Sequence, residues 1–278
     1  MRLVSYRSPG GPRAGLVLGD AVVDAWKALG VPQRSSLREL LAEGRLGELS
    51  EVDRGEPMSG AELLPPIPDP EKIVCIGLNY RSHAEETGIE PPASPTMFAK
   101  YRNSLAPPSA TVELPAASEK VDYEAEVAFV IGRTAKAVSE EDAINHVAGY
   151  TLFNDLSARD LQFATPQWMP GKVFDGSAPC GPALVTPDEA GPDDRIEIAL
   201  DLNGERMQSA STADLIFSVS ALVAHLSRLM TLVPGDLVAT GTPAGVGSVR
   251  KPRVWLQDGD EIVVSSPTLG RLETRIAR

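Results

Sequence analysis

The hydrophobic residues of the chain fall into short runs that are separated by turns and charged residues. Residues 73–77 and 127–131 are continuous apolar runs, which are typical of strands buried on both faces. Apolar and polar positions alternate over residues 196–202, which predicts a half-exposed strand, and Asn203-Gly204 supplies its turn. Few helical patterns lie between such runs. The pattern predicts a β-rich α+β fold and argues against a doubly wound nucleotide-binding fold.

The first 69 residues differ from the rest in the elements that their sequence predicts. Residues 1–30 contain closely spaced short strands, which predict a small antiparallel sheet. Residues 35–50 predict a helix that begins at serines and ends at Gly44. Residues 65–70 contain four prolines and therefore form neither a helix nor a central strand. We predict a small N-terminal α+β domain over residues 1–69 and a second, β-rich domain over residues 70–278.

The second domain contains further strand and helix patterns. The clearest helix is predicted over residues 213–230, before Pro234-Gly235. His146 and His225 lie within helical patterns, and we assign them no role. Strands are predicted over residues 124–131, 149–154, 183–185, 237–240 and 261–264.

Composition and charge exclude several classes of function. The formal net charge of −12 argues against a nucleic-acid partner, which would require a basic face. No apolar run is long enough to cross a membrane, and the polar sequence after Met1 does not resemble a signal peptide. Cys75 and Cys180 are far apart and are expected to be reduced, as in a cytoplasmic protein. The three histidines lie in unrelated segments, which argues against a zinc site built from histidines.

Three carboxylates form a candidate metal site. Glu124 and Glu126 are two positions apart on a predicted strand, so both point to the same face, roughly 7 Å apart. Two carboxylates beside an apolar strand repel each other unless a cation neutralises them. Asp155 ends another apolar run and can supply a third ligand. Oxygen ligands favour Mg²⁺, Mn²⁺ or Ca²⁺, whereas an exposed acidic strand end is the alternative that needs no metal.

Six ordered motifs lie at residues 73–80 with His83, 122–126, 154–160, 171–175 with Gly181-Pro182, 234–236 and 240–247. Together they resemble the fumarylacetoacetate hydrolase family from Pro70 to the C-terminus. The resemblance implies that Glu124, Glu126 and Asp155 bind Mg²⁺ or Mn²⁺. It also implies a catalytic domain built as a mixed β-roll or sandwich, preceded by a small N-terminal domain, and a homodimer.

His83 and Glu86 are candidates for a base and its orienting carboxylate. Ser82-His83-Ala84-Glu85 has the form of a capping box, and Gly88 can end the short helix that follows. Glu86 then lies three positions after His83 on the same helix face and can fix its tautomer. Hydrolytic members of the family carry such a pair on a lid-like segment, although a lone histidine is more often a surface or core residue.

The resemblance also suggests residues that contact the substrate. The matching family lysine faces the substrate's oxyanion, which assigns Lys172 to the active site, although an exposed lysine is the ordinary interpretation of its sequence. Arg159, Gln162 and Thr242 are candidate substrate contacts, with Thr242 in a Gly-rich loop whose N–H groups can bind a carboxylate. Lys100 and Ser104 resemble residues of a family loop near the site and are not assigned a catalytic role.

The family acts on small 2-oxo acids, and the predicted reaction is Mg²⁺- or Mn²⁺-dependent hydrolysis of a C–C bond in an acylpyruvate or 2,4-diketo acid. His83 would activate water, and cleavage would expel a pyruvate-type enolate that the metal and Lys172 hold. Two alternatives use the same site, namely isomerisation of 2-hydroxyhepta-2,4-diene-1,7-dioate and decarboxylation of an oxaloacetate-like acid. A non-catalytic metal-binding protein would need the three carboxylates but neither the base nor Lys172.

Overall fold

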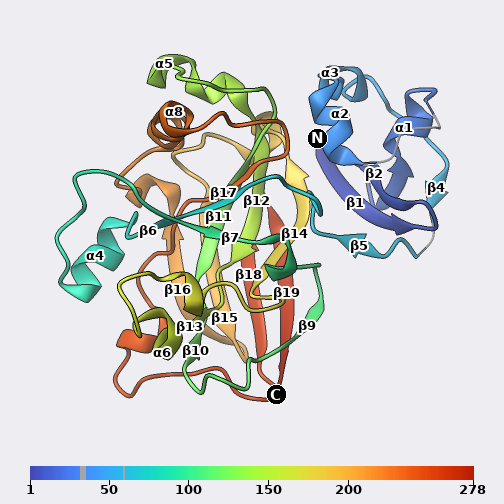
Figure 1. Ribbon diagram of the computed structural model, residues 1–278. Helices are drawn as coiled ribbons and strands as arrows, with labels where there is room; N and C mark the ends of the chain where they lie inside the picture. The colour runs from blue at the N-terminus through green and yellow to red at the C-terminus, as the bar shows by residue number, and fades with distance from the viewer. Residues whose placement is uncertain (32–35, 59) are drawn as a thin grey trace.

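A large mixed sheet forms the frame of the computed structural model, which describes residues 1–31, 36–58 and 60–278 (Figure 1). In spatial order the sheet contains β4 (Pro57–Met58), β3 (Ala21–Asp24), β2 (Gly11–Leu18), β1 (Arg2–Ser8), β14 (Ala178–Val185), β12 (Val147–Asn154), β11 (Ala125–Ile131), β17 (Leu237–Ala239), β6 (Ile73–Gly77) and β7 (Thr96–Lys100). Two short strands flank this path, β5 (Leu63–Leu64) beside β1 and β8 (Leu105–Ala106) beside β14.

A second, five-stranded sheet packs against the middle of the large one. Its order is β16 (Glu205–Ser211), β15 (Glu197–Leu202), β18 (Glu261–Ser266), β19 (Gly270–Ala277) and β9 (Ala110–Glu113), and a short ribbon pairs β10 (Val121–Asp122) with β13 (Ser157–Ala158). The predicted strands at residues 124–131, 149–154, 183–185, 237–240 and 261–264 all fall within or next to observed strands. The β-rich α+β fold with a sandwich of sheets is confirmed.

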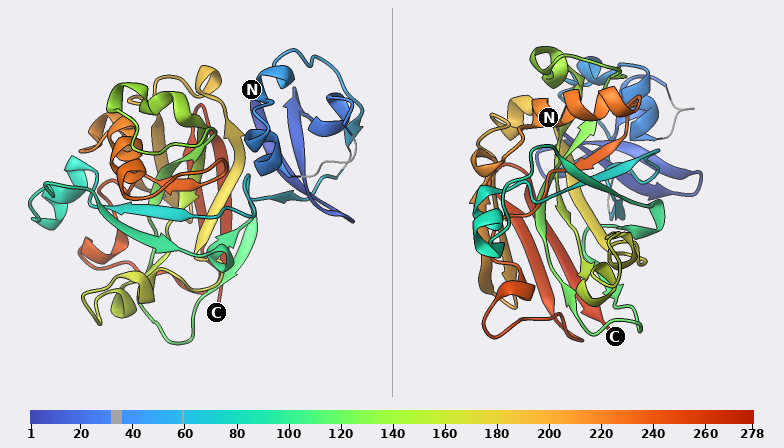
Figure 2. Two further views of the ribbon diagram at one scale, coloured as in Figure 1. Left: turned by 45° about the horizontal axis from the view of Figure 1, so that its top comes forward. Right: turned by 60° about the vertical axis from the view of Figure 1, so that its left-hand side comes forward.

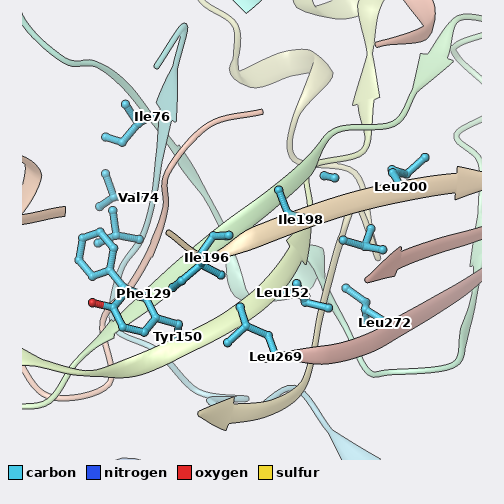
Figure 3. Close-up of a cluster of buried hydrophobic side chains, with 14 of the residues drawn as sticks. Val74, Ile76, Phe129, Tyr150, Leu152, Ile196, Ile198, Leu200, Leu269 and Leu272 are labelled. Carbon is cyan, nitrogen blue, oxygen red and sulfur yellow. The ribbon is translucent and has the colours of Figure 1, made fainter. Parts of the chain in front are cut away.

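The core between the two sheets explains the hydrophobic pattern. Figure 3 shows Phe129, Tyr150 and Leu152 of the large sheet among Ile198 and Leu272 of the second sheet. Strands of the second sheet alternate buried and exposed positions because only one face meets this core. By contrast, β11 and β12 are buried at every position, since residues of their other face, such as Ala128 and Phe153, belong to a second apolar cluster that also contains Leu3 and Trp26.

The helices are short and lie around the sheets. They are α1 (Ala25–Ala28), α2 (Leu37–Ala42), α3 (Leu46–Leu49), α4 (Arg81–Thr87), α5 (Glu140–Ala143), α6 (Arg159–Gln162), α7 (Pro187–Ala190) and α8 (Val219–Leu229). The 3₁₀ helices are η1 (Arg102–Ser104), η2 (Ile144–His146), η3 (Met169–Gly171), η4 (Thr212–Asp214) and η5 (Gly247–Val249). Across the described residues, no helix is long and apolar enough to cross a membrane.

Two helix predictions need correction. The helix predicted over residues 213–230 begins only at Val219, because the Ser218 side chain accepts a hydrogen bond from the backbone of Ala221 and caps it there. The helix predicted over residues 35–50 is two helices, α2 and α3. Ser36 and Glu39 form a capping box at the start of α2, whereas Ser35 lies outside the described residues. Gly44 separates the two helices with a φ of 69°, a conformation that favours glycine.

The N-terminal residues form a distinct lobe that shares its sheet with the rest (Figure 1, upper right). Strands β1 to β5 meander around Trp26, which is fully buried. However, β1 also pairs antiparallel with β14, with Arg2 opposite Val185 and Leu3 opposite Leu184. The predicted boundary at residue 69 follows this lobe in the sequence, but hydrogen bonding of the sheet continues across it.

Candidate metal centre and active site

Antiparallel pairing of β11 and β12 brings the three predicted carboxylates together. Ala125 lies opposite Asn154, so the residues before β11 adjoin those after β12. The backbone N–H of Asp155 donates to the carbonyl of Glu124 at 2.9 Å. One oxygen atom from each of Glu124, Glu126 and Asp155 lies within 4.8 Å of the other two, and all three residues are buried. The sequence spacing thus corresponds to a compact group of oxygen donors.

Buried cations neutralise two of these carboxylates. The Lys172 ammonium donates to Glu124 Oε2 at 2.8 Å, Asp155 Oδ2 at 2.7 Å and the Ser157 hydroxyl. Arg159 Nη2 lies 2.7 Å from Glu124 Oε1. Burial raises the pKa of Glu124, but the charges of Lys172 and Arg159 outweigh burial and lower the pKa to about 2. Burial lowers the pKa of Lys172, and Asp155 and Glu124 more than reverse this, so the raised pKa keeps its ammonium charged.

Glu126 has a different environment. Its Oε2 accepts a hydrogen bond from the backbone of Gly241 at 2.8 Å, and no lysine or arginine of the described residues forms an ion pair with it. Burial, followed by the charges of Asp155 and Glu124, raises the pKa of Glu126 well above its usual range. A buried carboxylate that lacks a cation beside two other carboxylates fits a hard divalent ion. Three oxygen donors suit Mg²⁺ or Mn²⁺ better than Zn²⁺.

Lys100 is a buried member of this centre that the sequence interpretation left without a role. It lies at the end of β7, and its ammonium donates to Asp155 Oδ1 at 2.7 Å and to the backbone carbonyl of Lys172. Both carboxylate oxygens of Asp155 are therefore held by lysines. Lys100 occupies an inward position of an alternating strand, and this alternation of Phe98, Ala99 and Lys100 is the signal that could have identified it.

The His83–Glu86 pair forms as predicted on α4, but the helix begins elsewhere. His83 Nδ1 lies 3.1 Å from Glu86 Oε2, and Glu86 Oε1 accepts the backbone N–H of Gly245 at 2.8 Å. The predicted cap at Ser82 is wrong, since Tyr80 is the N-cap and Ser82 lies inside the helix, where its own N–H donates to a nearby carboxylate. Gly88 ends the helix with a φ of 68°, as predicted.

The predicted substrate contacts line the site but also bind other protein groups. Arg159 donates from Nε to Asp122 at 2.9 Å and from Nη1 to Gln162 Oε1 at 3.0 Å. Thr242 Oγ1 accepts a hydrogen bond from Gln208 Nε2 at 2.9 Å. Asp122, which the motif contained without a role, is buried and orients Arg159 toward Glu124. Its spacing of two from Glu124 could have indicated this.

The Gly-rich loop at residues 240–247 differs from the expectation that its N–H groups bind substrate. The N–H of Gly241 donates to Glu126, that of Gly245 to Glu86 and that of Gly247 to Asp122. The loop thus holds three carboxylates of the site in place. Its glycines permit this course, since Gly241 and Gly245 have φ of 100° and 108°.

A cavity of about 350 Å³ connects these groups. The predicted residues that line it are His83, Glu124, Glu126, Arg159, Gln162, Lys172 and Thr242. Apolar walls come from Ile76, Phe98 and Trp168, and the ring of Trp168 packs so closely on Gly77 that no Cβ would fit there. In the left view of Figure 2, α4 (teal) and α6 (olive) both lie outside the strands, and His83 of α4 and Arg159 and Gln162 of α6 line the cavity. Such walls exclude water and strengthen electrostatic interactions inside.

The order of the site residues matches a known family. Residues 72–277 match the profile described as Fumarylacetoacetate (FAA) hydrolase C-terminal. The chain belongs to this family. The relative named "Oxaloacetate tautomerase fahd2, mitochondrial" from Xenopus laevis is 40% identical to the chain, over 99% of the chain and 90% of the relative. Its name includes a mitochondrial location, which differs from the cytoplasmic location predicted for this chain.

Two solved structures extend the comparison. The 2-hydroxyhepta-2,4-diene-1,7-dioate isomerase from Mycobacterium marinum is 32% identical, with a TM-score of 0.79, over 100% of this chain and 98% of that one. Maleylpyruvate hydrolase from Sphingobium sp. SYK-6, solved with manganese(II) and pyruvate, is 29% identical with a TM-score of 0.82, over 100% and 99%. The fold is therefore that of family enzymes, which include proteins named as a tautomerase, an isomerase and a hydrolase.

Proposed function

We propose that the chain is a divalent-metal-dependent enzyme that moves a proton at C3 of a short 2-oxo diacid, interconverting the keto and enol forms of an oxaloacetate-like acid. The observation that carries this proposal is one cavity lined by the His83 imidazole, the Lys172 ammonium and two clustered carboxylates, Glu124 and Glu126. Asp155 completes the carboxylate cluster from a fully buried position, and Glu86 orients the imidazole. The name of the 40% identical relative supports the choice of substrate.

His83 is suited to move the proton. In its neutral form the imidazole donates from Nδ1 to Glu86 Oε2, which leaves the lone pair of Nε2 as the base. Proton transfer by a positioned base contributes roughly 10²–10⁴-fold to a rate. The hydrogen bond from Gly245 to the other oxygen of Glu86 fixes the carboxylate, so the imidazole ring is held in one orientation.

Lys172, together with an ion held by the three carboxylates, can stabilise the negative charge that develops on the substrate. Removal of a proton from C3 by His83 moves negative charge to the 2-oxo oxygen, where the ammonium of Lys172 stabilises it. Transfer of that proton from the His83 imidazolium to the oxygen then gives the enol, and the reverse steps regenerate the keto form. A bound divalent cation would polarise the 2-oxo group. Glu124, Glu126 and Asp155 would hold that ion, Arg159 and Lys100 orient two of these carboxylates, and the apolar walls keep bulk water away.

C–C hydrolysis of an acylpyruvate, the reaction predicted from the sequence, is the second candidate. The same His83 base would take a proton from water, and the resulting hydroxide would attack the distal carbonyl. The His83–Glu86 pair favours this reaction over decarboxylation of an oxaloacetate-like acid, which needs no water base. The manganese and pyruvate in the structure of maleylpyruvate hydrolase support a 2-oxo acid beside a divalent ion.

The test records the loss of the enol substrate and the release of two products, CO₂ and pyruvate. Freshly dissolved enol-oxaloacetate is added to the protein with Mg²⁺, Mn²⁺ or EDTA, and decay of the enol absorbance is recorded alongside CO₂ release. Pyruvate release is measured from an acylpyruvate in parallel. Metal-dependent enol decay that is lost in Glu124→Gln supports the tautomerase. Pyruvate release from the acylpyruvate without enol decay would reject the tautomerase in favour of the hydrolase. CO₂ release without either of these would favour the decarboxylase.

The assembly and location of the enzyme remain predictions. We expect a homodimer in the cytoplasm whose substrate is a small 2-oxo acid. We expect it to bind neither nucleic acid nor a membrane. Light scattering of the purified protein measures the mass directly, and a mass of one chain would contradict the dimer.

A further inference from the structure

Two positive side chains line the outer part of the cavity and have no place in the mechanism above. Lys120 precedes β10 and Arg253 follows η5, and both line the cavity that holds His83 and Lys172. Both residues are exposed, and within the described part of the chain neither forms an ion pair. They stand out on a protein whose formal net charge is −12.

Backbone hydrogen bonds hold the two segments on one side of the cavity. The carbonyl of Lys120 accepts the N–H of Arg159 at 2.9 Å, and the carbonyl of Val121 accepts the N–H of Leu256 at 2.9 Å. Lys120 is thus fixed between the start of α6 and the segment that carries Arg253. The N–H of Val254 donates to Gly247 at 3.0 Å, which anchors that segment to the loop of the site.

The two buried cations of the cavity, Lys172 and Arg159, cannot bind a second carboxylate of the substrate unless they release protein carboxylates. Lys172 uses its three N–H groups on Glu124, Asp155 and Ser157, and Arg159 is bound to Asp122, Glu124 and Gln162. An anionic group at the far end of a substrate therefore needs cations from elsewhere in the cavity. Lys120 and Arg253 are such cations, and an arginine can bind a carboxylate with two parallel hydrogen bonds.

We infer that Lys120 and Arg253 bind the distal carboxylate of the substrate and make the enzyme select dicarboxylic over monocarboxylic 2-oxo acids. The inference rests on the proposed action on a 2-oxo acid and names the residues that determine its substrate class. A diacid enters with its 2-oxo carboxylate toward the buried carboxylate centre and its distal carboxylate between the two outer cations.

The test compares two acids that differ only at the far end, 2-oxoglutarate and 2-oxopentanoate. Binding of each to the Mn²⁺-loaded protein is measured by titration calorimetry for the wild type, Lys120→Gln and Arg253→Gln. We expect the wild type to prefer the diacid by about 10-fold or more, and each substitution to reduce that preference by roughly 3- to 10-fold without changing the affinity for the monoacid. Charge-preserving Lys120→Arg and Arg253→Lys should retain the preference.

Lys136→Gln is the matched control, since Lys136 is an exposed lysine outside the cavity. It should leave both affinities unchanged. Equal loss of affinity for the two acids in the cavity variants, or no loss for either, overturns the inference. Binding is measured without turnover, so the enol assay can fail while the diacid preference stands, and that result would reject the tautomerase and keep the diacid site.

Discussion

Two networks of carboxylates and cations in this molecule differ in how completely their charges are matched. In the N-terminal lobe, Asp24 Oδ2 accepts the Tyr6 hydroxyl and Arg13 Nε, each at 2.6 Å, and Oδ1 accepts the N–H of Lys27 at 2.8 Å. Both oxygens of this carboxylate have protein partners. In the buried centre of the site, Asp122, Glu124, Glu126 and Asp155 outnumber the buried cations Lys100, Arg159 and Lys172, and Glu126 has no cation among the described residues.

The difference is what the proposed metal site requires, since a network that binds an ion needs carboxylates beyond those that protein cations neutralise. A buried charge without a counter-charge destabilises the folded state, and such sites persist where function requires them. The excess of carboxylates in the buried centre suits a divalent cation, whereas both oxygens of Asp24 already have protein partners. Substitutions in the two networks should therefore affect stability with opposite signs.

Glu126→Gln should have the largest effect on activity. The substitution removes one of three candidate metal ligands, and we expect metal-dependent activity to fall by about 10³-fold or more. Because the amide retains an acceptor for Gly241 and removes repulsion among buried carboxylates, the melting temperature in EDTA should equal or exceed that of the wild type. A clear decrease in that melting temperature, measured by calorimetry, would contradict the comparison.

His83→Ala should be next, with a loss of roughly 10²–10⁴-fold in kcat. Metal binding should be unchanged because His83 is not among the three carboxylates, and Mn²⁺ titration measures this directly. Glu86→Gln serves as the companion variant, since it keeps the contact to Gly245 but weakens the orienting charge. An intact rate in His83→Ala would remove the base from the mechanism.

Asp24→Asn should lower stability while sparing catalysis. The substitution weakens charge-assisted hydrogen bonds and the cap of α1, so we expect the free energy of unfolding to fall by about 1 kcal/mol. Burial raises the pKa of Asp24, but hydrogen bonds from Arg13 and Tyr6 outweigh it and lower the pKa. The stabilisation is thus present above the ordinary pKa near 3.8 and is lost as the pH falls further. Denaturant unfolding between about pH 3 and pH 7 measures both effects.

Tyr6→Phe should have the smallest effect, confined to alkaline pH. Burial, and then the hydrogen bond to Asp24, raise the pKa of Tyr6 from 10.0 to about 12. A raised folded-state pKa gives stability that is present below pH 10 and lost as the pH rises toward 12. In Tyr6→Phe, the free energy of unfolding, measured with denaturant, should lack this part of its decline between pH 10 and pH 12. An identical alkaline decline in the two proteins would assign it to other groups.

The sequence predicted the parts of the site that follow from strand geometry. Glu124 and Glu126 share a face because alternation has a period of two, and Asp155 follows a strand that pairs with theirs. The start of α4 was placed wrongly because Ser82 has the residue type of a cap, while the hydrogen bond from its N–H to Asp214 depends on a distant segment. Alternation points Lys100 inward, and a spacing of two relates Asp122 to Glu124, but their partners Asp155 and Arg159 lie far along the chain, and local patterns do not identify them.

The pairing of β1 with β14 has a consequence for how the chain can be divided. A truncated protein that begins after residue 69 would expose the backbone of β14 at Leu184 and Val185, the positions that Leu3 and Arg2 cover. An open, apolar strand edge of this kind recruits other chains and promotes aggregation. The N-terminal lobe therefore covers the edge of β14 and protects it from pairing with other chains. We expect the lobe and the rest of the chain to unfold in one cooperative transition.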